Sequence, residues 1–174
     1  MIGPDRSDRI DRTGAAIRRA ARPIWLYRLL MTTTVDARLA RLSTPALALF
    51  RIIIGLLFAL HGAMKLFGWP HGESVPVGTW PVWWAGLIEL IVGLLVTVGL
   101  FTRISAIIGS GQMAVAYFWM HWPPLEGEPT SFWPVVNGGE PALLYCFGFL
   151  LLAATGPGAW ALDAMMRRRA PATA

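Results

Sequence analysis

Residues 46–67 read ALALFRIIIGLLFALHGAMKLF, an apolar run that only three ionisable side chains interrupt. A helix needs about 20 predominantly apolar residues to cross the hydrocarbon core of a membrane, and this run meets that length. Ser43 or Thr44 is placed to cap the start of the helix, and Pro45 suits its first turn. The run therefore predicts a membrane-spanning helix that begins close to residue 46.

Three further stretches have the same apolar character, and they lie at 81–101, 103–122 and 141–162. They lack the one-sided stripe of a soluble amphipathic helix, and they do not alternate as strands of a membrane β-barrel do. Gly156-Pro157-Gly158 is expected to break or bend the last of them near its inner end. The sequence thus predicts an all-α fold, a four-helix transmembrane bundle within residues 45–163.

The composition supports a membrane protein and excludes several other classes. Hydrophobic residues make up 55% of the chain and charged residues 14%, whereas soluble domains carry about 25% charged residues. A mean hydropathy of +0.53 is too apolar for a disordered chain. Cys146 is the single cysteine, so the chain has no internal disulfide and no C-x-x-C redox motif. No zinc-type ligand spacing is present, and the sequence predicts no metal site.

Both ends of the chain are basic. Residues 1–44 carry nine Arg and four Asp, and three consecutive arginines stand at 167–169. The loops at 68–80 and 123–140 contain no Lys or Arg. Because basic residues stay on the cytoplasmic side of a membrane, we expect both termini to be cytoplasmic. The protein is then a multi-pass protein of a bacterial-type cytoplasmic (plasma) membrane.

The basic tails are interpreted as flanks of membrane helices, although the sequence pI is about 10.3. No nucleic-acid motif supports the alternative, so no nucleic-acid partner is expected. Within the cytoplasmic arm, residues 1–44, apolar residues lie among arginines at 24–30. This arm is either a helix that lies on the inner leaflet or a disordered basic tail. Residues 1–13 are expected to be disordered, and residues 164–174 form a second basic tail.

Seven polar side chains within or at the ends of the spans are candidates for function, because ionisable groups are costly to keep inside a membrane. They are Arg51, His61, Lys65, Glu89, Gln112, His121 and Glu140. Five of them come from four different spans yet share the outer half of the membrane: His61, Lys65, Glu89, His121 and Glu140. Glu89 lies about 12 Å from the outer end of its span at 1.5 Å per residue, which is deep for a short side chain.

Helical phase places small and polar residues on shared faces of the spans. Three stripes result: Arg51, Gly55, Gly62 and Lys65; then Gly86, Glu89 and Gly93; then Ser105, Gly109, Gln112, Ala116 and Trp119. Small residues let helices approach closely. We therefore expect the stripes to line one interior, with Glu89 opposite Lys65 or His61.

Each candidate also has a plainer structural interpretation. Arg51 and Lys65 lie near span ends, where long basic side chains can reach the headgroups instead of facing the interior. Glu89 with Lys65 forms either a pair that holds two helices in register or a site for proton transfer or ligand binding. His121 is most simply an interfacial residue. A haem held by His61 and His121 would need both rings to face one cavity.

Several short motifs follow one another along residues 47–163. They are R-x3-G at Arg51–Gly55, G-x2-K at Gly62–Lys65, E-L-x2-G-L at Glu89–Leu94, G-L-F-T-R at Gly99–Arg103, N-G-G-E at Asn137–Glu140 and G-P-G-x4-D at Gly156–Asp163. In this order and spacing they resemble the DoxX-like family of small four-helix membrane proteins. The family's namesake is linked to a membrane thiosulfate:quinone oxidoreductase, and other relatives to oxidative-stress complexes. The sequence itself shows no evident cofactor; the resemblance brings quinone-linked redox chemistry, and quinone as a candidate cofactor, into view and identifies no catalytic residue.

Three classes of function follow. The favoured one is a subunit associated with quinone-linked or oxidative-stress redox chemistry. Since the chain has no flavin, iron–sulfur or haem motif, it is at most a subunit of a quinone-linked oxidoreductase. The alternative is a non-enzymatic membrane scaffold or assembly factor, and a small transporter is less favoured because no inverted repeat is visible. The expected partners are the lipid bilayer and other membrane subunits or further copies of the chain.

Overall fold

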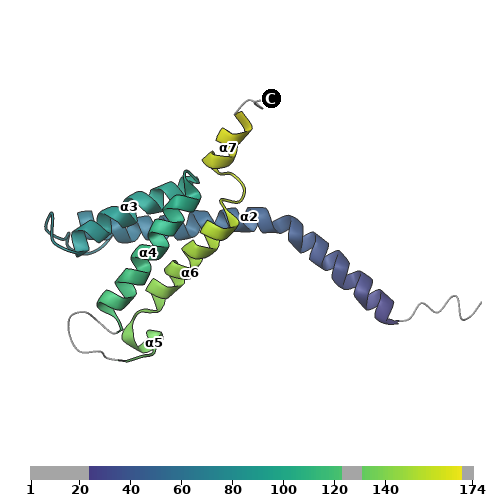
Figure 1. Ribbon diagram of the computed structural model, residues 1–174, viewed down its shortest axis with the longest axis horizontal. Coiled ribbons are helices and arrows are strands. Elements are labelled where there is room, and N and C mark those ends of the chain that lie inside the picture. Colours follow the sequence, from purple (N-terminus) through teal and green to yellow (C-terminus); the bar gives the residue numbers. More distant parts are fainter. Residues whose placement is uncertain (1–23, 123–130, 170–174) are drawn as a thin grey trace, which may run out of the picture. The chain divides into compact units, whose positions relative to one another are not determined.

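The computed structural model describes residues 24–122 and 131–169, and these residues contain helices and loops but no strand (Figure 1). The helices within them are α2 Ile24–Phe67, α3 Val82–Val98, α4 Thr102–Met120, α5 Pro134–Asn137, α6 Glu140–Thr155 and α7 Leu162–Arg169. The chain divides into two compact units, Met1–Ser43 and Thr44–Ala174. The predicted all-α class is confirmed for the described residues, and the expected disorder of residues 1–13 lies outside them.

The first helix begins much earlier than the sequence predicts. α2 starts at Ile24 rather than near residue 46, and Pro45 lies inside it. Ser43 does not cap a helix start, because its hydroxyl donates to the Ala40 carbonyl oxygen at 2.7 Å within a continuing helix. Residues 24–44 include several Leu, Ala and Arg and no Gly, which favours a helix over a disordered tail. The described residues 24–44 are thus helical, and the predicted cap is wrong.

Glycines bring α2 and α3 into backbone contact within the second unit. A Cβ atom on Gly93 would lie 2.7 Å from the carbonyl oxygen of Gly55, and one on Gly55 would lie 2.8 Å from the amide nitrogen of Thr97. A Cβ atom on Gly62 would lie 2.5 Å from the carbonyl oxygen of Gly86. Only glycine allows two helices to approach this closely, so the small-residue faces of α2 and α3 meet as expected.

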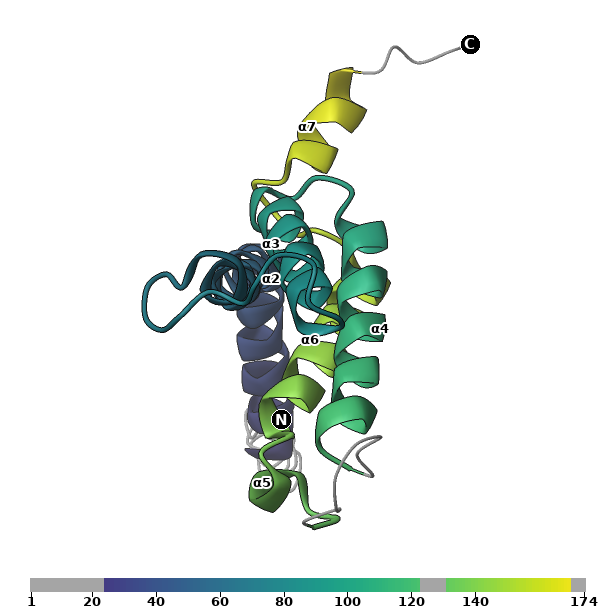
Figure 2. The same cartoon turned by 90° about the vertical axis from the view of Figure 1, so that its left-hand side faces the viewer.

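Large apolar side chains fill the space around this helix pair. α4 and α6 lie side by side (Figure 1 and Figure 2). The Phe149 ring of α6 packs on Gly109 of α4, and it meets the Phe58 ring of α2 edge-on, with centroids 4.8 Å apart. Val92 of α3 and Leu152 of α6 belong to the same buried cluster. The core of the second unit therefore joins residues of α2, α3, α4 and α6.

The last predicted span is shorter than expected. α6 ends at Thr155 after 16 residues, and the chain leaves helical geometry at Gly156, whose φ of 93° is readily adopted only by glycine. Pro157 has no amide hydrogen with which to continue the helix. The predicted break at 156–158 is confirmed, and it separates α6 from α7.

Asp163, near the start of α7, ties this helix to the turn between α3 and α4. Its carboxylate accepts from the Phe101 amide at 2.8 Å, and from the Thr102 amide and hydroxyl at 2.9 and 2.8 Å. The amide of Asp163 in turn donates to the carbonyl oxygen of Gly99 at 2.9 Å. The carboxylate satisfies amides that the start of α4 would otherwise leave unpaired, and its charge suits the helix dipole there.

Apolar side chains cover much of the outside of the second unit. Exposed examples from its helices are Leu56, Ile91, Ile107, Phe147 and Leu150. Soluble monomers rarely expose extensive apolar surface of this kind. Among the described helices, one segment, Val35–Phe67, has the length and apolar composition to cross a membrane, while α3 and α6 are apolar but shorter. The surface and this segment both fit a membrane protein.

Candidate functional site

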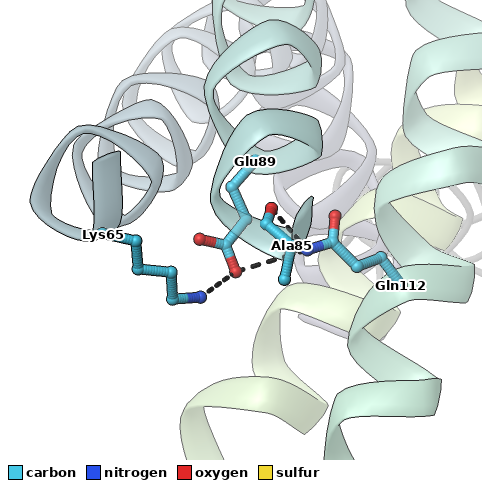
Figure 3. Close-up of polar contacts among 4 residues, drawn as sticks. All are labelled: Lys65, Ala85, Glu89 and Gln112. Atoms are coloured by element: carbon cyan, nitrogen blue, oxygen red, sulfur yellow. Dashed lines mark hydrogen bonds and ion pairs between the residues drawn. The ribbon is translucent and has the colours of Figure 1, made fainter. Parts of the chain in front are cut away.

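Three polar side chains from three helices meet inside the second unit: Lys65 of α2, Glu89 of α3 and Gln112 of α4 (Figure 3). Glu89 Oε1 accepts from the Lys65 ammonium in an ion pair, and it accepts from Gln112 Nε2 at 3.3 Å. Gln112 Nε2 also donates to the backbone carbonyl of Ala85 at 3.0 Å. Glu89 is 2% exposed and Lys65 31% exposed. The contact between Glu89 and Lys65 that helical phase predicts is therefore present.

Local sequence explains why these side chains meet. Gly86 lies one turn before Glu89 on α3, and a Cβ atom there would lie 2.8 Å from Cβ of Lys65. The Lys65 stem therefore runs across a gap that only glycine leaves open. Gly62 lies one turn before Lys65 on α2 and contacts the backbone of Leu90. The glycines thus set the short distance between helices that the ion pair needs.

A pocket of about 180 Å³ lies against this polar cluster. Its lining residues come from the start of α3, the second half of α4 and the end of α2: Lys65, Pro81, Val82, Ala85, Glu89, Gln112, Val115, Ala116, Trp119 and Met120. Most of these side chains are apolar. Val115 and Met120 are also exposed on the outer surface of α4. The pocket therefore has apolar walls, one polar end, and a rim on the apolar exterior.

Two acceptor atoms of the cluster have no hydrogen-bond partner among the described residues. They are Oε2 of Glu89 and Oε1 of Gln112, and both are buried. Flipping the Gln112 side-chain amide would not supply a partner. Its oxygen would then face the Ala85 carbonyl and Glu89 Oε1, which are themselves acceptors. Lys65 and Gln112 both donate to the same carboxylate oxygen, so the hydrogen bonding of Glu89 is one-sided.

Three of the other candidates form no hydrogen bond with this cluster in the described part of the chain. His61 is exposed, and its ring meets the Tyr145 ring edge-on at 5.7 Å. His121 Nδ1 lies 2.9 Å from the carbonyl oxygen of Asn137. Glu140 is exposed in the first turn of α6. Within the described ranges, no hydrogen bond links these residues to Glu89, and no three His, Cys, Asp or Glu side chains are grouped to hold a metal.

Arg51 lies four turns before Lys65 on α2 and is fully buried. Its Nη2 donates to the carbonyl oxygens of Trp160 at 3.2 Å and Ala159 at 3.4 Å, in the segment that leads into α7. Nε and Nη1 have no hydrogen-bond partner in the described part of the chain. The side chain therefore faces protein, and the interpretation that it reaches the headgroups is wrong. Arg51 connects α2 to the α6–α7 segment and does not line the pocket.

Two features of the site were not anticipated from the sequence. The Ala85 carbonyl anchors Gln112, and Pro81 and Val82 form one wall of the pocket. Ala85 precedes Glu89 by four residues, so helical spacing does place it on the Glu89 face. No sequence spacing marks Pro81 and Val82 in the same way, because they line the pocket only as a result of how α3 packs against α4.

The all-helical fold, the apolar exterior and the buried ion pair define a helical membrane protein. A sequence profile of the DoxX family matches residues 46–122. The chain belongs to the DoxX family. The match begins near the start of the second unit and covers α3, α4 and the whole Lys65–Glu89–Gln112 cluster.

Relatives agree with this assignment. A protein of Haemophilus influenzae, named as uncharacterised, is 42% identical over 67% of this chain and 87% of its own length. An uncharacterised membrane protein of Mycobacterium tuberculosis is 27% identical over 74% of this chain and 85% of its own length. The inner membrane protein YqjF of Escherichia coli is 30% identical over 68% and 90%. No solved structure gives a significant match.

Proposed function

We propose that the chain crosses the cytoplasmic membrane four times, through α2, α3, α4 and α6, with both termini in the cytoplasm. At 1.5 Å per residue, α3, α4 and α6, with 17, 19 and 16 residues, extend about 24–29 Å, and the hydrocarbon core is about 30 Å thick. Arg103 in the first turn of α4 and the basic ends of the chain support this orientation, since basic residues stay in the cytoplasm.

Reporter fusions test the proposed topology. We expect green fluorescent protein fused after residue 174 to fluoresce, because an even number of spans returns the C-terminus to the cytoplasm. Alkaline phosphatase, which becomes active only outside the cytoplasm, is expected to be inactive there and active when inserted at Ser131, between α4 and α5. The measurement is the ratio of the two reporter activities per fusion protein. Strong phosphatase activity at the C-terminus contradicts the four-span arrangement.

We infer further that the pocket beside Glu89 binds the ring headgroup of a lipid-soluble quinone, and that the chain is a subunit of a quinone-linked redox system. One observation carries this proposal: an apolar pocket with a charged polar end and a rim at the exposed residues Val115 and Met120. Its volume of about 180 Å³ is below the 300–1,000 Å³ of sites that enclose a whole ligand. Such a pocket suits a headgroup whose tail stays in the lipid.

The chemistry of the lining residues supports the same ligand class. A bound quinone supplies redox chemistry, and the protein supplies binding, orientation and electrostatics. The Lys65 ammonium carries three N–H donors and gives one to Glu89, so it can hold a ring oxygen as well. The Glu89 carboxylate balances the charge of Lys65, and a hydrogen bond from Gln112 holds that carboxylate in position. Because the sequence holds no flavin or metal motif, electrons come from a partner subunit in this proposal.

Filling the pocket tests quinone binding directly. Ala116→Phe adds a ring to the pocket wall, and we expect the quinone that co-purifies with the protein from native membranes to fall at least tenfold. Ile108→Phe is the matched control, because Ile108 is exposed on the same helix and does not line the pocket. The measurement is quinone per mole of protein after solvent extraction.

Two outcomes decide the proposal. Retained quinone in wild type and in Ile108→Phe, with loss in Ala116→Phe, supports it. Absence of quinone from all three proteins, purified from quinone-containing membranes, contradicts it. The non-enzymatic scaffold would then be the better interpretation, with Lys65 and Glu89 serving only to join α2 to α3.

A further inference from the structure

We propose that the pocket selects the oxidised headgroup, the quinone, over the reduced quinol. This inference rests on the proposed function and adds which redox form is the ligand. Its basis is the hydrogen-bonding character of the lining side chains. The ring oxygens of a quinone only accept hydrogen bonds, whereas each hydroxyl of a quinol also carries a proton that needs an acceptor.

The reachable polar groups of the pocket wall are donors. Lys65 is 31% exposed, and its ammonium has N–H groups beyond the one that Glu89 accepts. Trp119 also lines the pocket, and an indole nitrogen donates but does not accept. The Lys65 ammonium can donate to a carbonyl oxygen of a quinone ring. Neither an ammonium nor an indole N–H can accept a hydrogen bond from a quinol hydroxyl.

The acceptors of the site are withdrawn from the pocket. Glu89 Oε1 already accepts from two donors, Lys65 Nζ and Gln112 Nε2. Glu89 Oε2 and Gln112 Oε1 are buried, with essentially no accessible surface. The bond from Gln112 to the Ala85 carbonyl keeps the amide oxygen in this place. The ion pair therefore presents the Lys65 ammonium to the pocket, while Glu89 Oε2 and Gln112 Oε1 stay buried.

The other described side chains of the wall supply no oxygen or nitrogen acceptor in their place. Its side chains are Pro81, Val82, Ala85, Val115, Ala116 and Met120, which are apolar. A quinol that entered would leave hydroxyl protons unpaired in an apolar site, and a buried donor without a partner is unfavourable. The pocket thus favours arrival of the oxidised form and release of the reduced form.

The test is equilibrium binding of one quinone in its two redox states to the full chain in lipid nanodiscs. We use decylubiquinone under air and decylubiquinol under anaerobic, reducing conditions, with dissociation constants from titration calorimetry. We expect the quinone to bind at least tenfold more tightly, equivalent to about 1.4 kcal/mol. Equal affinities, or tighter binding of the quinol, overturn the inference.

A charge-neutral double variant shows whether the donor is responsible. Lys65→Met with Glu89→Gln removes the ammonium without leaving a buried carboxylate, and we expect the preference to fall from tenfold or more to less than threefold. Glu73→Gln, in the exposed loop before α3, is the control and keeps the wild-type preference. A double variant that binds quinone but retains the full preference overturns the role of Lys65. The wild-type measurement stands by itself if the double variant fails to fold.

The ester carbonyls of phospholipids are also hydrogen-bond acceptors, so a phospholipid could occupy the pocket in place of the quinone. Nanodiscs of ether-linked lipids lack these carbonyls and distinguish the two sources. Equal quinone affinity in ester and ether lipids supports the quinone as ligand, whereas affinity that appears only in ether lipids identifies phospholipid as the occupant. Failure of both redox forms to bind in either lipid contradicts the proposed function, while binding without preference contradicts only this inference.

Discussion

Replacing Gly62 by leucine is expected to prevent stable folding of the second unit. A Cβ atom at this position would lie 2.5 Å from the Gly86 carbonyl oxygen and 2.9 Å from Cα of Leu90, so the new side chain meets backbone. Overpacked cores lose about 1–3 kcal/mol when side chains can adjust, and backbone cannot adjust as readily. We therefore expect a loss of more than about 3 kcal/mol, seen as little monodisperse protein after heating in detergent.

The chain provides a matched control for this substitution. Gly111 lies on the exposed side of α4, and a Cβ atom there would have no described atom within 4 Å. Gly111→Leu introduces the same side chain into a helix, and we expect a melting midpoint equal to or above that of the wild type, because leucine has a higher helix propensity. Similar midpoints for the two leucine variants would show that α2 and α3 do not touch at Gly62.

The second large effect concerns the ion pair. Lys65→Met removes the ammonium and leaves Glu89, 2% exposed, as a buried carboxylate with only Gln112 as a donor. Removing one partner of a buried pair costs about 3–5 kcal/mol, and the partial exposure of Lys65 places this case near the lower figure. We expect the melting midpoint of Lys65→Met in detergent to fall by several degrees.

The double variant Lys65→Met, Glu89→Gln is expected to recover most of this loss. Replacing both members of a buried pair by neutral residues of similar size is often close to neutral for stability. The measurement is a double-mutant cycle of melting midpoints for wild type, the two single variants and the double variant in one detergent. Additive losses would mean that Lys65 and Glu89 do not depend on each other. Recovery of stability together with a weakened preference for quinone would separate the structural role of the pair from its role in binding.

The sequence predicts some parts of the site because helical phase is a local property. The stripe from Gly62 to Lys65 and the stripe from Gly86 to Glu89 follow from spacing alone, and their meeting is seen in the structure. The exclusion of charge from a membrane makes a deep Glu conspicuous in any such sequence. The helix break at 156–158 can also be predicted from the sequence, because Gly and Pro determine the local backbone geometry directly.

Other features depend on contacts between residues far apart in the chain. Asp163 caps α4 across 61 residues, and Arg51 bonds to Trp160 across 109 residues. No local pattern marks such pairs, since they depend on how the segment after α6 folds back. The sequence pattern does not predict the start of α2 at Ile24, for a different reason. Ser43 and Pro45 fit a helix start, yet the preceding residues are good enough helix formers to continue through them.

Three properties follow from the amino-acid sequence without any coordinates: the helical membrane class, the faces of α2 and α3 that meet, and Glu89 as the buried acid. These properties follow from hydrophobic length and a period of 3.6 residues, and both can be read along a single segment. The bond from Gln112 to the Ala85 carbonyl and the pocket beside Lys65 depend instead on how the helices pack. Packing likewise places His121 against the Asn137 carbonyl and leaves Glu140 exposed, and among the described residues neither forms a hydrogen bond with Glu89. The physical reason is that close packing fixes distances between helices to fractions of an ångström, and one segment alone carries no information about the shape of its neighbour.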